Sequence, residues 1–345
     1  MNPAQHGFTM PPEWAQHSRT IMEWPVKEAV WPEPFAEILP AYAEIVRAIA
    51  RFEPVTLLVN PQLRQEAADH CGQFATILAL EHNDSWARDN GPTFVKNAQG
   101  EIAGINWIFN AWGGKFAADK DNRVAPSLLK HFGVPCFDAP LVMEGGSIHV
   151  DGEGTLLTTE ECLLNPNRNP HLNRRQLTEY LRQYVGAAKI IWLKNGWVGD
   201  DTDGHVDNVV CFARPGVVIV QVCSDPNDPN YAVSQENLAI LRNATDAKGR
   251  SFEIVTIEQP PAVTYDETRL TLSYLNFYFV NGGIVLPLFG NEATDRAALV
   301  TLANVFPDRT IATVDGLVIA RGGGNVHCLT QQLPAGEPAT LSLER

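Results

Sequence analysis

Five short segments rich in glycine and polar residues recur along the chain, each after a strand-like run. Two of them are nearly the same string, EGGSIHV at 144–150 and GGGNVHC at 322–328. This likeness indicates equivalent loops built from one repeated unit. Five such units would bring their loops together around a common axis, although Gly-rich loops also end strands in α/β proteins without internal symmetry. The five segments are 88–92, 144–149, 203–208, 281–283 and 322–328.

Helix-like and strand-like runs alternate between these segments. Apolar residues from Phe35 to Ile49 recur at intervals of three and four, which predicts a helix, and a strand is predicted directly after it at 55–59. The fold class is therefore α/β, and since no low-complexity linker divides the chain, we expect a single domain over 1–345. Further strands are predicted at 76–80, 189–193, 217–222, 254–257 and 310–314, and further helices around 172–185, 235–241 and 295–306.

The chain is strongly acidic, with 40 Asp and Glu against 26 Lys and Arg. This balance disfavours nucleic acid or an anionic membrane as partner and favours a cationic substrate. No run of about 18 apolar residues and no signal-peptide pattern is present, so we expect a cytoplasmic protein. The six cysteines include no CxxC pair and fit neither a disulfide framework nor a zinc site by spacing.

Three segments carry residue types suited to chemistry. His205 and Asp207 stand two apart, so in an extended segment both side chains point to one face. Cys328 ends a glycine-rich run, and its neighbour His327 would face the opposite way, which makes His205 the better acid/base partner. Asp89 stands just before a turn, downstream of a predicted strand.

Each of these residues also has a structural interpretation when taken singly. A cysteine is most often a core residue, an aspartate a turn or capping residue, and a histidine a hydrogen-bonded structural residue. The acidic run 200–207 invites a calcium interpretation. However, Gly204 comes too early for an EF-hand loop, and Phe212 stands where that loop needs Glu, so we expect no bound metal.

Taken together, the segments resemble the agmatine deiminases, members of the guanidine-modifying pentein superfamily that are related to peptidyl-arginine deiminases. The resemblance extends in order from residue 10 to residue 332. The strings that carry it are MPPEW (10–14), NDSWARDNGP (83–92), FNAWGGKF (109–116), EGGSIHVDGEGTLLTTEECLLNPNRNP (144–170), GDDTDGHVDN (199–208), NFYFVNGG (276–283) and GGGNVHCLTQQ (322–332).

The resemblance implies a fivefold pseudosymmetric α/β propeller of about five ββαβ-like repeats, with the active site on the central axis. It implies that Cys328 is the nucleophile, that His205 is the acid/base, and that Asp89 and Asp207 hold a guanidinium. The reaction would convert agmatine to N-carbamoylputrescine and ammonia through an amidino-cysteine, in putrescine and polyamine biosynthesis, without metal or organic cofactor. A homodimer or higher homo-oligomer is also implied.

The far end of agmatine is an ammonium group, and three residues are candidates to contact it. Trp112 could act by cation–π interaction, and Glu144 or Asp201 by charge. Each also has a structural interpretation: Trp112 in loop packing, Glu144 as a partner of backbone N–H groups, and Asp201 in a turn. Glu23 stands where the resemblance leads us to expect a neutral residue, and would either place a carboxylate near the entrance or face solvent.

Two alternatives share the same core chemistry. A deiminase of arginine or peptidyl-arginine would need a clamp for a carboxylate or peptide, and an amidinotransferase would pass the amidino group to an amine. A non-catalytic guanidinium-binding protein is disfavoured because Cys328, His205, Asp89 and Asp207 are all retained. Two carboxylates beside the thiol also disfavour its thiolate, so we expect Cys328 not to be strongly acidic until a cation binds.

Overall fold

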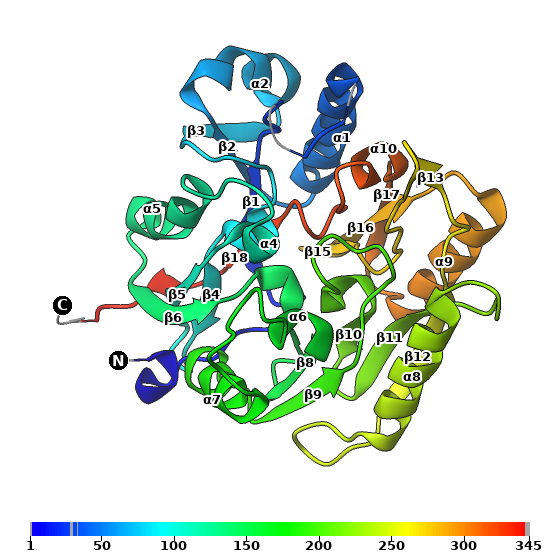
Figure 1. Ribbon diagram of the computed structural model, residues 1–345. Coiled ribbons are helices and arrows are strands. Elements are labelled where there is room, and N and C mark those ends of the chain that lie inside the picture. The colour runs from blue at the N-terminus through cyan, green and yellow to red at the C-terminus, as the bar shows by residue number, and fades with distance from the viewer. Residues whose placement is uncertain (1, 28–29, 33, 342–345) are drawn as a thin grey trace.

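The structure is a computed structural model that describes residues 2–27, 30–32 and 34–341. In these residues, five units of related topology follow one another around a ring (Figure 1). Each unit contains an antiparallel strand pair whose second strand continues through a helix to a parallel neighbour. The fivefold α/β architecture implied by the resemblance is thus present in the topology.

The first unit joins both ends of the chain. It comprises β18 (Gln331–Pro334), β1 (His17–Glu23), α1 (Ile38–Ala50) and β2 (Val55–Val59), extended by α2 (Arg64–Cys71) and β3 (Ala75–Ala79). The second comprises β4 (Thr93–Lys96), β5 (Glu101–Ile108), α5 (Val124–Phe132) and β6 (Cys136–Val142). The third comprises β7 (His149–Val150), β8 (Thr155–Thr159), α7 (Arg174–Val185) and β9 (Lys189–Leu193).

The last two units repeat the pattern. The fourth comprises β10 (Val210–Arg214), β11 (Val217–Val222), α8 (Asn230–Asn243) and β12 (Glu253–Glu258). The fifth comprises β15 (Tyr278–Val280), β16 (Gly283–Leu288), α9 (Glu292–Val305) and β17 (Thr310–Asp315). Short elements complete the fold: α3 (Ala87–Asn90), α4 (Ala111–Gly114), α6 (Glu160–Leu163), α10 (Leu317–Ala320), β13 (Thr264–Tyr265), β14 (Thr268–Arg269) and β19 (Glu337–Pro338).

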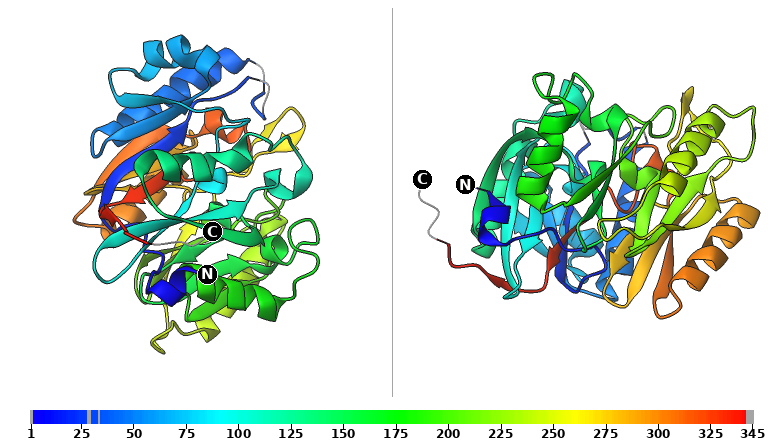
Figure 2. Two further views of the ribbon diagram at one scale, coloured as in Figure 1. Left: turned by 90° about the vertical axis from the view of Figure 1, so that its left-hand side faces the viewer. Right: turned by 90° about the horizontal axis from the view of Figure 1, so that it is seen from below.

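The long helices lie on the outside of the ring, and the strands face its centre (Figures 1 and 2). The apolar stripe of α1 is buried, and all of β2 is buried as well. In the second unit β5 and α5 approach closely, since a Cβ at Gly104 would lie 2.2 Å from Cδ2 of Leu129. Apolar contact between each helix and its sheet therefore holds the individual units together.

Most predicted elements are confirmed. The strands predicted at 55–59, 189–193 and 217–222 coincide with β2, β9 and β11, and the first predicted helix corresponds to α1 with a preceding 3-10 turn at Phe35–Glu37. Helix α8 is longer than predicted because polar side chains, among them Asn230 and Ser234, lie on its buried face and hide the apolar period.

The sequence pattern does not predict every element. It does not predict the second unit, where β5 is buried at successive positions rather than at alternate ones. Helix α5 spans only nine residues and carries Pro126 in its first turn, which weakens the helical signal. Among the described residues, no helix is long and apolar enough to cross a membrane.

Glu53 ties the first unit to the fifth. Its carboxylate accepts hydrogen bonds from the Thr20 hydroxyl at 2.6 Å and from the backbone N–H of Asn281 at 2.8 Å, and His17 Nδ1 lies 3.0 Å away. Thr20 and His17 belong to β1, whereas Asn281 lies in the turn between β15 and β16. Glu53 is itself buried, so these contacts are shielded from water and close the ring.

We predict that Glu53→Ala lowers the free energy of unfolding by about 3 kcal/mol, because the hydroxyl of Thr20, the imidazole of His17 and the part-buried N–H of Asn281 all lose the carboxylate that they share. Chemical denaturation followed by fluorescence measures the change. Glu44→Ala, on the exposed face of α1, is the matched control and should change stability by less than about 0.5 kcal/mol. Equal effects of the two substitutions would show that Glu53 does not hold the units together.

Candidate active site

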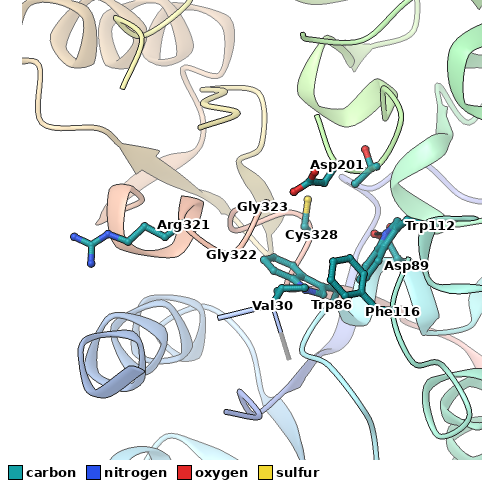
Figure 3. A pocket seen from close by; sticks show the side chains of 12 residues that line it. Val30, Trp86, Asp89, Trp112, Phe116, Asp201, Arg321, Gly322, Gly323 and Cys328 are labelled. Atoms are coloured by element: carbon teal, nitrogen blue, oxygen red, sulfur yellow. Dashed lines mark hydrogen bonds between the residues drawn. The ribbon is translucent and has the colours of Figure 1, made fainter. Parts of the chain in front are cut away.

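A pocket with a volume of about 160 Å³ opens near the centre of the ring (Figure 3). Four of the predicted site residues line it: Asp89, Trp112, Asp201 and Cys328. Aromatic rings form much of its wall, and glycines bring the backbone close to it. The remaining lining residues are Val30, Trp86, Phe116, Thr202, Arg321, Gly322, Gly323 and Gly324.

Cys328 lies at the buried end of this pocket and is 3% exposed. Asn276 Nδ2 donates a hydrogen bond to its Sγ at 3.2 Å, and Sγ lies 3.6 Å from Asp207 Oδ2. Burial raises the pKa of the Cys328 thiol well above its usual value, and the nearby carboxylates of Asp207 and Asp89 raise it further. The expectation that Cys328 is not acidic in the free protein is therefore supported, with burial as the larger cause.

Asp207 presents one engaged and one available carboxylate oxygen. Its Oδ2 accepts a hydrogen bond from His327 Nδ1 at 2.8 Å, while Oδ1 is buried without a hydrogen-bond partner among the described residues. Burial alone would raise the pKa of Asp207, but His327, His205 and Arg88 outweigh it and hold that pKa below its usual value. Asp207 is thus an anion whose Oδ2 lies beside the thiol and whose Oδ1 has no partner among the described residues.

Asp89 faces the same space from α3. Its Oδ1 accepts a hydrogen bond from the backbone N–H of Gly146 at 3.0 Å, and its Oδ2 accepts one from Trp112 Nε1 at 2.9 Å. Burial raises the pKa of Asp89, and Asp207 adds to the rise, whereas His205 and Trp112 oppose it. Trp112 therefore orients Asp89 while its ring forms part of the pocket wall.

His205 is fully buried between two carboxylates. Its Nδ1 lies 3.8 Å from Asp89 Oδ1 and its Nε2 lies 3.9 Å from Glu144 Oε2. Within the described part of the chain, neither ring nitrogen has a hydrogen-bond partner. A Cβ at Gly146 would lie 2.6 Å from Nδ1 and within 3.0 Å of both Asp207 and Asp89, so only glycine leaves room for these side chains to converge.

The segment 203–208 is not extended, so the alternation of side chains along a strand does not place His205 and Asp207 on one face. Asp203 has a φ of 61°, and a 3-10 turn over Val206–Asn208 follows His205. His205 and Asp207 nevertheless reach the same site, because the turn directs both side chains to the ring centre. His327 also lies in a turn rather than in a strand, so the alternation of side chains along a strand does not explain why it faces away from Cys328.

His327 does not bond to Cys328 but lies behind Asp207. Its Nε2 lies 2.7 Å from Glu13 Oε2, so the imidazole bridges two carboxylates. Burial and Arg88 would lower the pKa of His327, but Glu13 and Asp207 reverse this effect and raise it. Glu13 and Asn276 lie in strings that carry the resemblance, but no local signal assigns them this contact with the site.

The prediction that Glu144 contacts the substrate tail is wrong. Glu144 is fully buried and does not line the pocket. Its Oε1 accepts a hydrogen bond from Arg168 Nε at 2.7 Å, and its Oε2 faces His205. This pairing joins residues 24 positions apart in the chain, and the sequence offers no spacing rule that would reveal it.

The structure supports the expectation for Asp201 but not those for Glu23. Asp201 is exposed and lines the pocket, as a tail-binding residue requires. Glu23 is fully buried, so it neither faces solvent nor stands at the entrance, and both interpretations of it are wrong. Burial and the neighbouring Asp121 raise its pKa well above the usual value, while Asn90 Nδ2 donates to its Oε2 at 2.9 Å.

Comparisons with known proteins agree with this geometry. A Legionella pneumophila protein provisionally named agmatine deiminase is 50% identical to the chain over 335 residues, covering 96% of each. The solved structure of the agmatine deiminase of Enterococcus faecalis superposes with a TM-score of 0.94 at 36% identity, covering 96% of this chain and 97% of that one.

A second solved structure adds a ligand-bound relative. It is a C. jejuni agmatine deiminase with a cysteine replaced by serine and with substrate bound, which matches with a TM-score of 0.89 at 31% identity, covering 96% of this chain and 97% of that one. The sequence profile of the Porphyromonas-type peptidyl-arginine deiminases matches residues 9–334. The chain has the pentein fold and belongs to this Porphyromonas-type peptidyl-arginine deiminase family.

Proposed function

We propose that this protein is an agmatine deiminase, which hydrolyses agmatine to N-carbamoylputrescine and ammonia through a covalent amidino-cysteine. The observation that carries the proposal is the thiol of Cys328 at the base of an aromatic pocket, 3.6 Å from Asp207 and with Asp89 in the same pocket. The substrate-bound C. jejuni relative, in which a cysteine is changed to serine, supports this assignment.

Two carboxylates receive the substrate. A guanidinium is a planar cation whose N–H groups form a fixed fork, and carboxylates bind that fork through charge-assisted hydrogen bonds. Asp207 Oδ1 is free to accept such a bond. Asp89 already accepts two hydrogen bonds, but a carboxylate has about four acceptor positions and can take more.

Cys328 then attacks the central carbon of the guanidinium. His205 takes the thiol proton and delivers it to the leaving amino group, so that the C–N bond breaks, ammonia departs and a cationic amidino-thioether remains. Water next adds to that carbon, and the C–S bond breaks to give the ureido product and the thiol. One proton from water returns to sulfur through His205, and the other leaves with ammonia as ammonium.

Glu144 supports His205 during these reaction steps. Its Oε2 faces Nε2 of the imidazole, and Nδ1 on the other side of the ring faces Asp89 and the reacting groups. Arg168 holds the other oxygen of Glu144 and fixes its orientation. We therefore assign Glu144 as a positioning residue for His205.

The charges around the pocket favour an ammonium tail over an α-carboxylate. Of the described residues that line the pocket, Arg321 is the one cation, and its side chain points away from Cys328 (Figure 3). Arg321 is bound to Glu37 at 2.7 Å and lies over the ring of Tyr265. Lys115 is likewise bound to Asp203. This arrangement supports agmatine over arginine as the substrate.

We also propose a domain organisation, a cellular location and an oligomeric state for the protein. We infer that residues 1–345 act as a single catalytic domain, because side chains from separate units meet in one pocket. We propose a cytoplasmic homo-oligomer, a dimer or larger, that serves putrescine and polyamine biosynthesis. All six cysteines lie in the described residues and are free thiols, which suits a reducing compartment. The oligomer rests on the family resemblance, and light scattering of the purified protein tests it.

We predict that Cys328→Ala lowers ammonia release from agmatine by at least about 10⁴-fold, because the covalent path is lost. Ammonia and N-carbamoylputrescine are measured together, without added metal and with arginine as a parallel substrate. Cys71→Ala removes another buried thiol, far along the chain on α2, and should retain full activity. Turnover of arginine but not agmatine would overturn the substrate assignment, and activity in the Cys328 variant would overturn the nucleophile.

We predict that Asp201→Asn raises KM for agmatine about 2–5-fold with little change in kcat, because an exposed charge pair contributes at most about 1 kcal/mol. Steady-state kinetics of ammonia release give both constants. Asp308→Asn, an exposed aspartate elsewhere, is the matched control. A fall in kcat with KM unchanged would assign Asp201 to the chemistry rather than to the tail.

We predict that a small guanidinium that is not turned over speeds alkylation of Cys328 by iodoacetamide near pH 7. The bound cation offsets the carboxylates that raise the thiol pKa, so that pKa falls and the thiolate fraction grows. Mass spectrometry of the Cys328 peptide measures the rate, with low concentrations of urea as a neutral control of the same shape. An unchanged or slower rate with guanidinium would contradict the proposed electrostatic role.

A further inference from the structure

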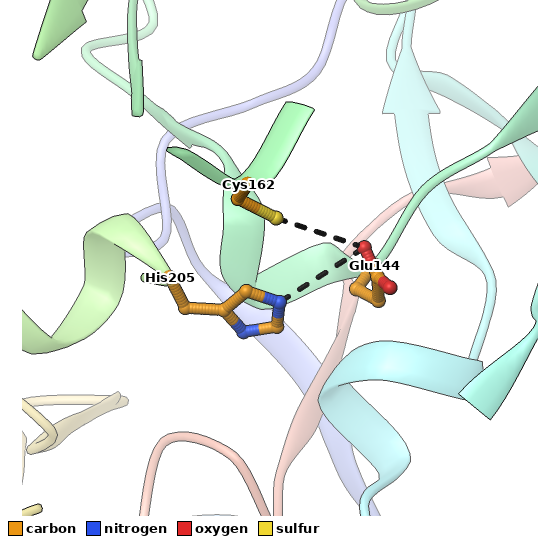
Figure 4. A group of neighbouring side chains, drawn as sticks. All are labelled: Glu144, Cys162 and His205. Carbon is orange, nitrogen blue, oxygen red and sulfur yellow. Dashed lines mark hydrogen bonds and ion pairs between the residues drawn. The ribbon is translucent and has the colours of Figure 1, made fainter. Parts of the chain in front are cut away.

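A second cysteine lies beside His205, on the side away from Asp89. Cys162 belongs to α6, and its Sγ lies 4.0 Å from Glu144 Oε2, which lies 3.9 Å from His205 Nε2 (Figure 4). These three atoms all lie within 4.8 Å of one another, and all three residues are fully buried. The proposed reaction assigns no role to Cys162.

Thiolate, imidazole and carboxylate are the three side-chain ligands that zinc prefers. In a tetrahedral site, zinc bonds of about 2.0–2.3 Å place the ligand atoms about 3.3–3.7 Å apart. The separations of 3.9 and 4.0 Å need to shorten by only about 0.5 Å to reach that spacing. The third separation, between Cys162 Sγ and His205 Nε2, is below 4.8 Å and needs to shorten by up to about 1.1 Å.

The ligand atoms are also available. His205 Nε2 has no hydrogen-bond partner among the described residues. Arg168 engages only Oε1 of Glu144, which leaves Oε2 directed at Cys162 and His205. Asp89, which lines the pocket, lies 3.8 Å from the opposite ring nitrogen of His205, so one side chain separates this cluster from the pocket.

We propose that Cys162, His205 and Glu144 form an inhibitory zinc site. A zinc ion held there takes His205 Nε2 as a neutral ligand, so the ring no longer gains and loses a proton during turnover. Cys162 gives its proton to solvent when it binds the metal. The ligands stand at positions 144, 162 and 205, a spacing that matches no sequence pattern for zinc. The inhibition rests on the proposed function, whereas the binding does not.

Cobalt(II) tests the binding directly, because a cobalt–thiolate bond gives a charge-transfer band in the near ultraviolet. Titration of the Cys328→Ala protein should give this band at one equivalent, which excludes the nucleophile as ligand. The band should vanish in Cys162→Ala/Cys328→Ala and persist in the matched Cys71→Ala/Cys328→Ala. Its persistence in the first double variant, or its absence from Cys328→Ala, would overturn the site.

Zinc inhibition tests the consequence. Activity of the single variant Cys162→Ala should be at least about 10-fold less sensitive to zinc than that of the wild type, because one ligand is missing. Cys162→Ser keeps the side-chain size and should give the same result, which separates ligand loss from a packing defect. Binding without inhibition would overturn the inhibitory role and count against His205 as acid/base. Equal zinc sensitivity of wild type and both variants would place the inhibitory metal elsewhere.

Discussion

Buried negative charge around a single thiol is the constraint on which the rest of the structure depends. Asp89, Glu144 and Asp207 are buried close to Cys328 or His205, and Glu13 is buried against His327, which binds Asp207. An unpaired buried carboxylate is very costly, so each one needs donors at fixed positions. Those donors come from distant parts of the chain: His327 for Glu13 and Asp207, Trp112 and Gly146 for Asp89, and Arg168 for Glu144. The site therefore holds the five units in register.

The hydrogen bonding of these buried groups is incomplete at one place in the described structure. Asp207 Oδ1 and both nitrogens of His205 lack hydrogen-bond partners among the described residues, next to a thiol that burial keeps protonated. A bound guanidinium supplies what is missing, namely positive charge and N–H donors at one point. Under the proposed function, selectivity for a cation and activation of Cys328 therefore have a common electrostatic origin. The cations at the rim do not disturb it because Arg321 and Lys115 are paired with carboxylates.

Much of the fold could be predicted from local sequence. Elements with a clear apolar period, such as α1, β2 and β11, are found in place. Four of the five glycine-rich segments contribute residues to the candidate site, whereas 281–283 forms the turn between β15 and β16 and contacts Glu53 instead. The second unit could not be predicted because β5 is buried on both faces and α5 is short. Cys328, His205, Asp89 and Asp207 could be chosen together as candidates because each lies in a distinctive string, and the structure brings them close to one another. The contact of Glu144 with Arg168 and the turn at 206–208 could not, since both depend on packing between remote segments.

Both ends of the described chain take part in closing the ring. Strand β18, from the C-terminal end, pairs with β1, and the N-terminal Thr9 and the C-terminal β19 both pair with the second unit, at β4 and β5. The ends of the described chain thus meet on neighbouring strands, and the ring is continuous across them. The ends of the described chain are therefore one of several places at which the ring can be open. A circular permutant with these ends linked and a new break at a partly exposed turn, such as Pro215–Gly216 between β10 and β11, keeps every strand pair of the ring.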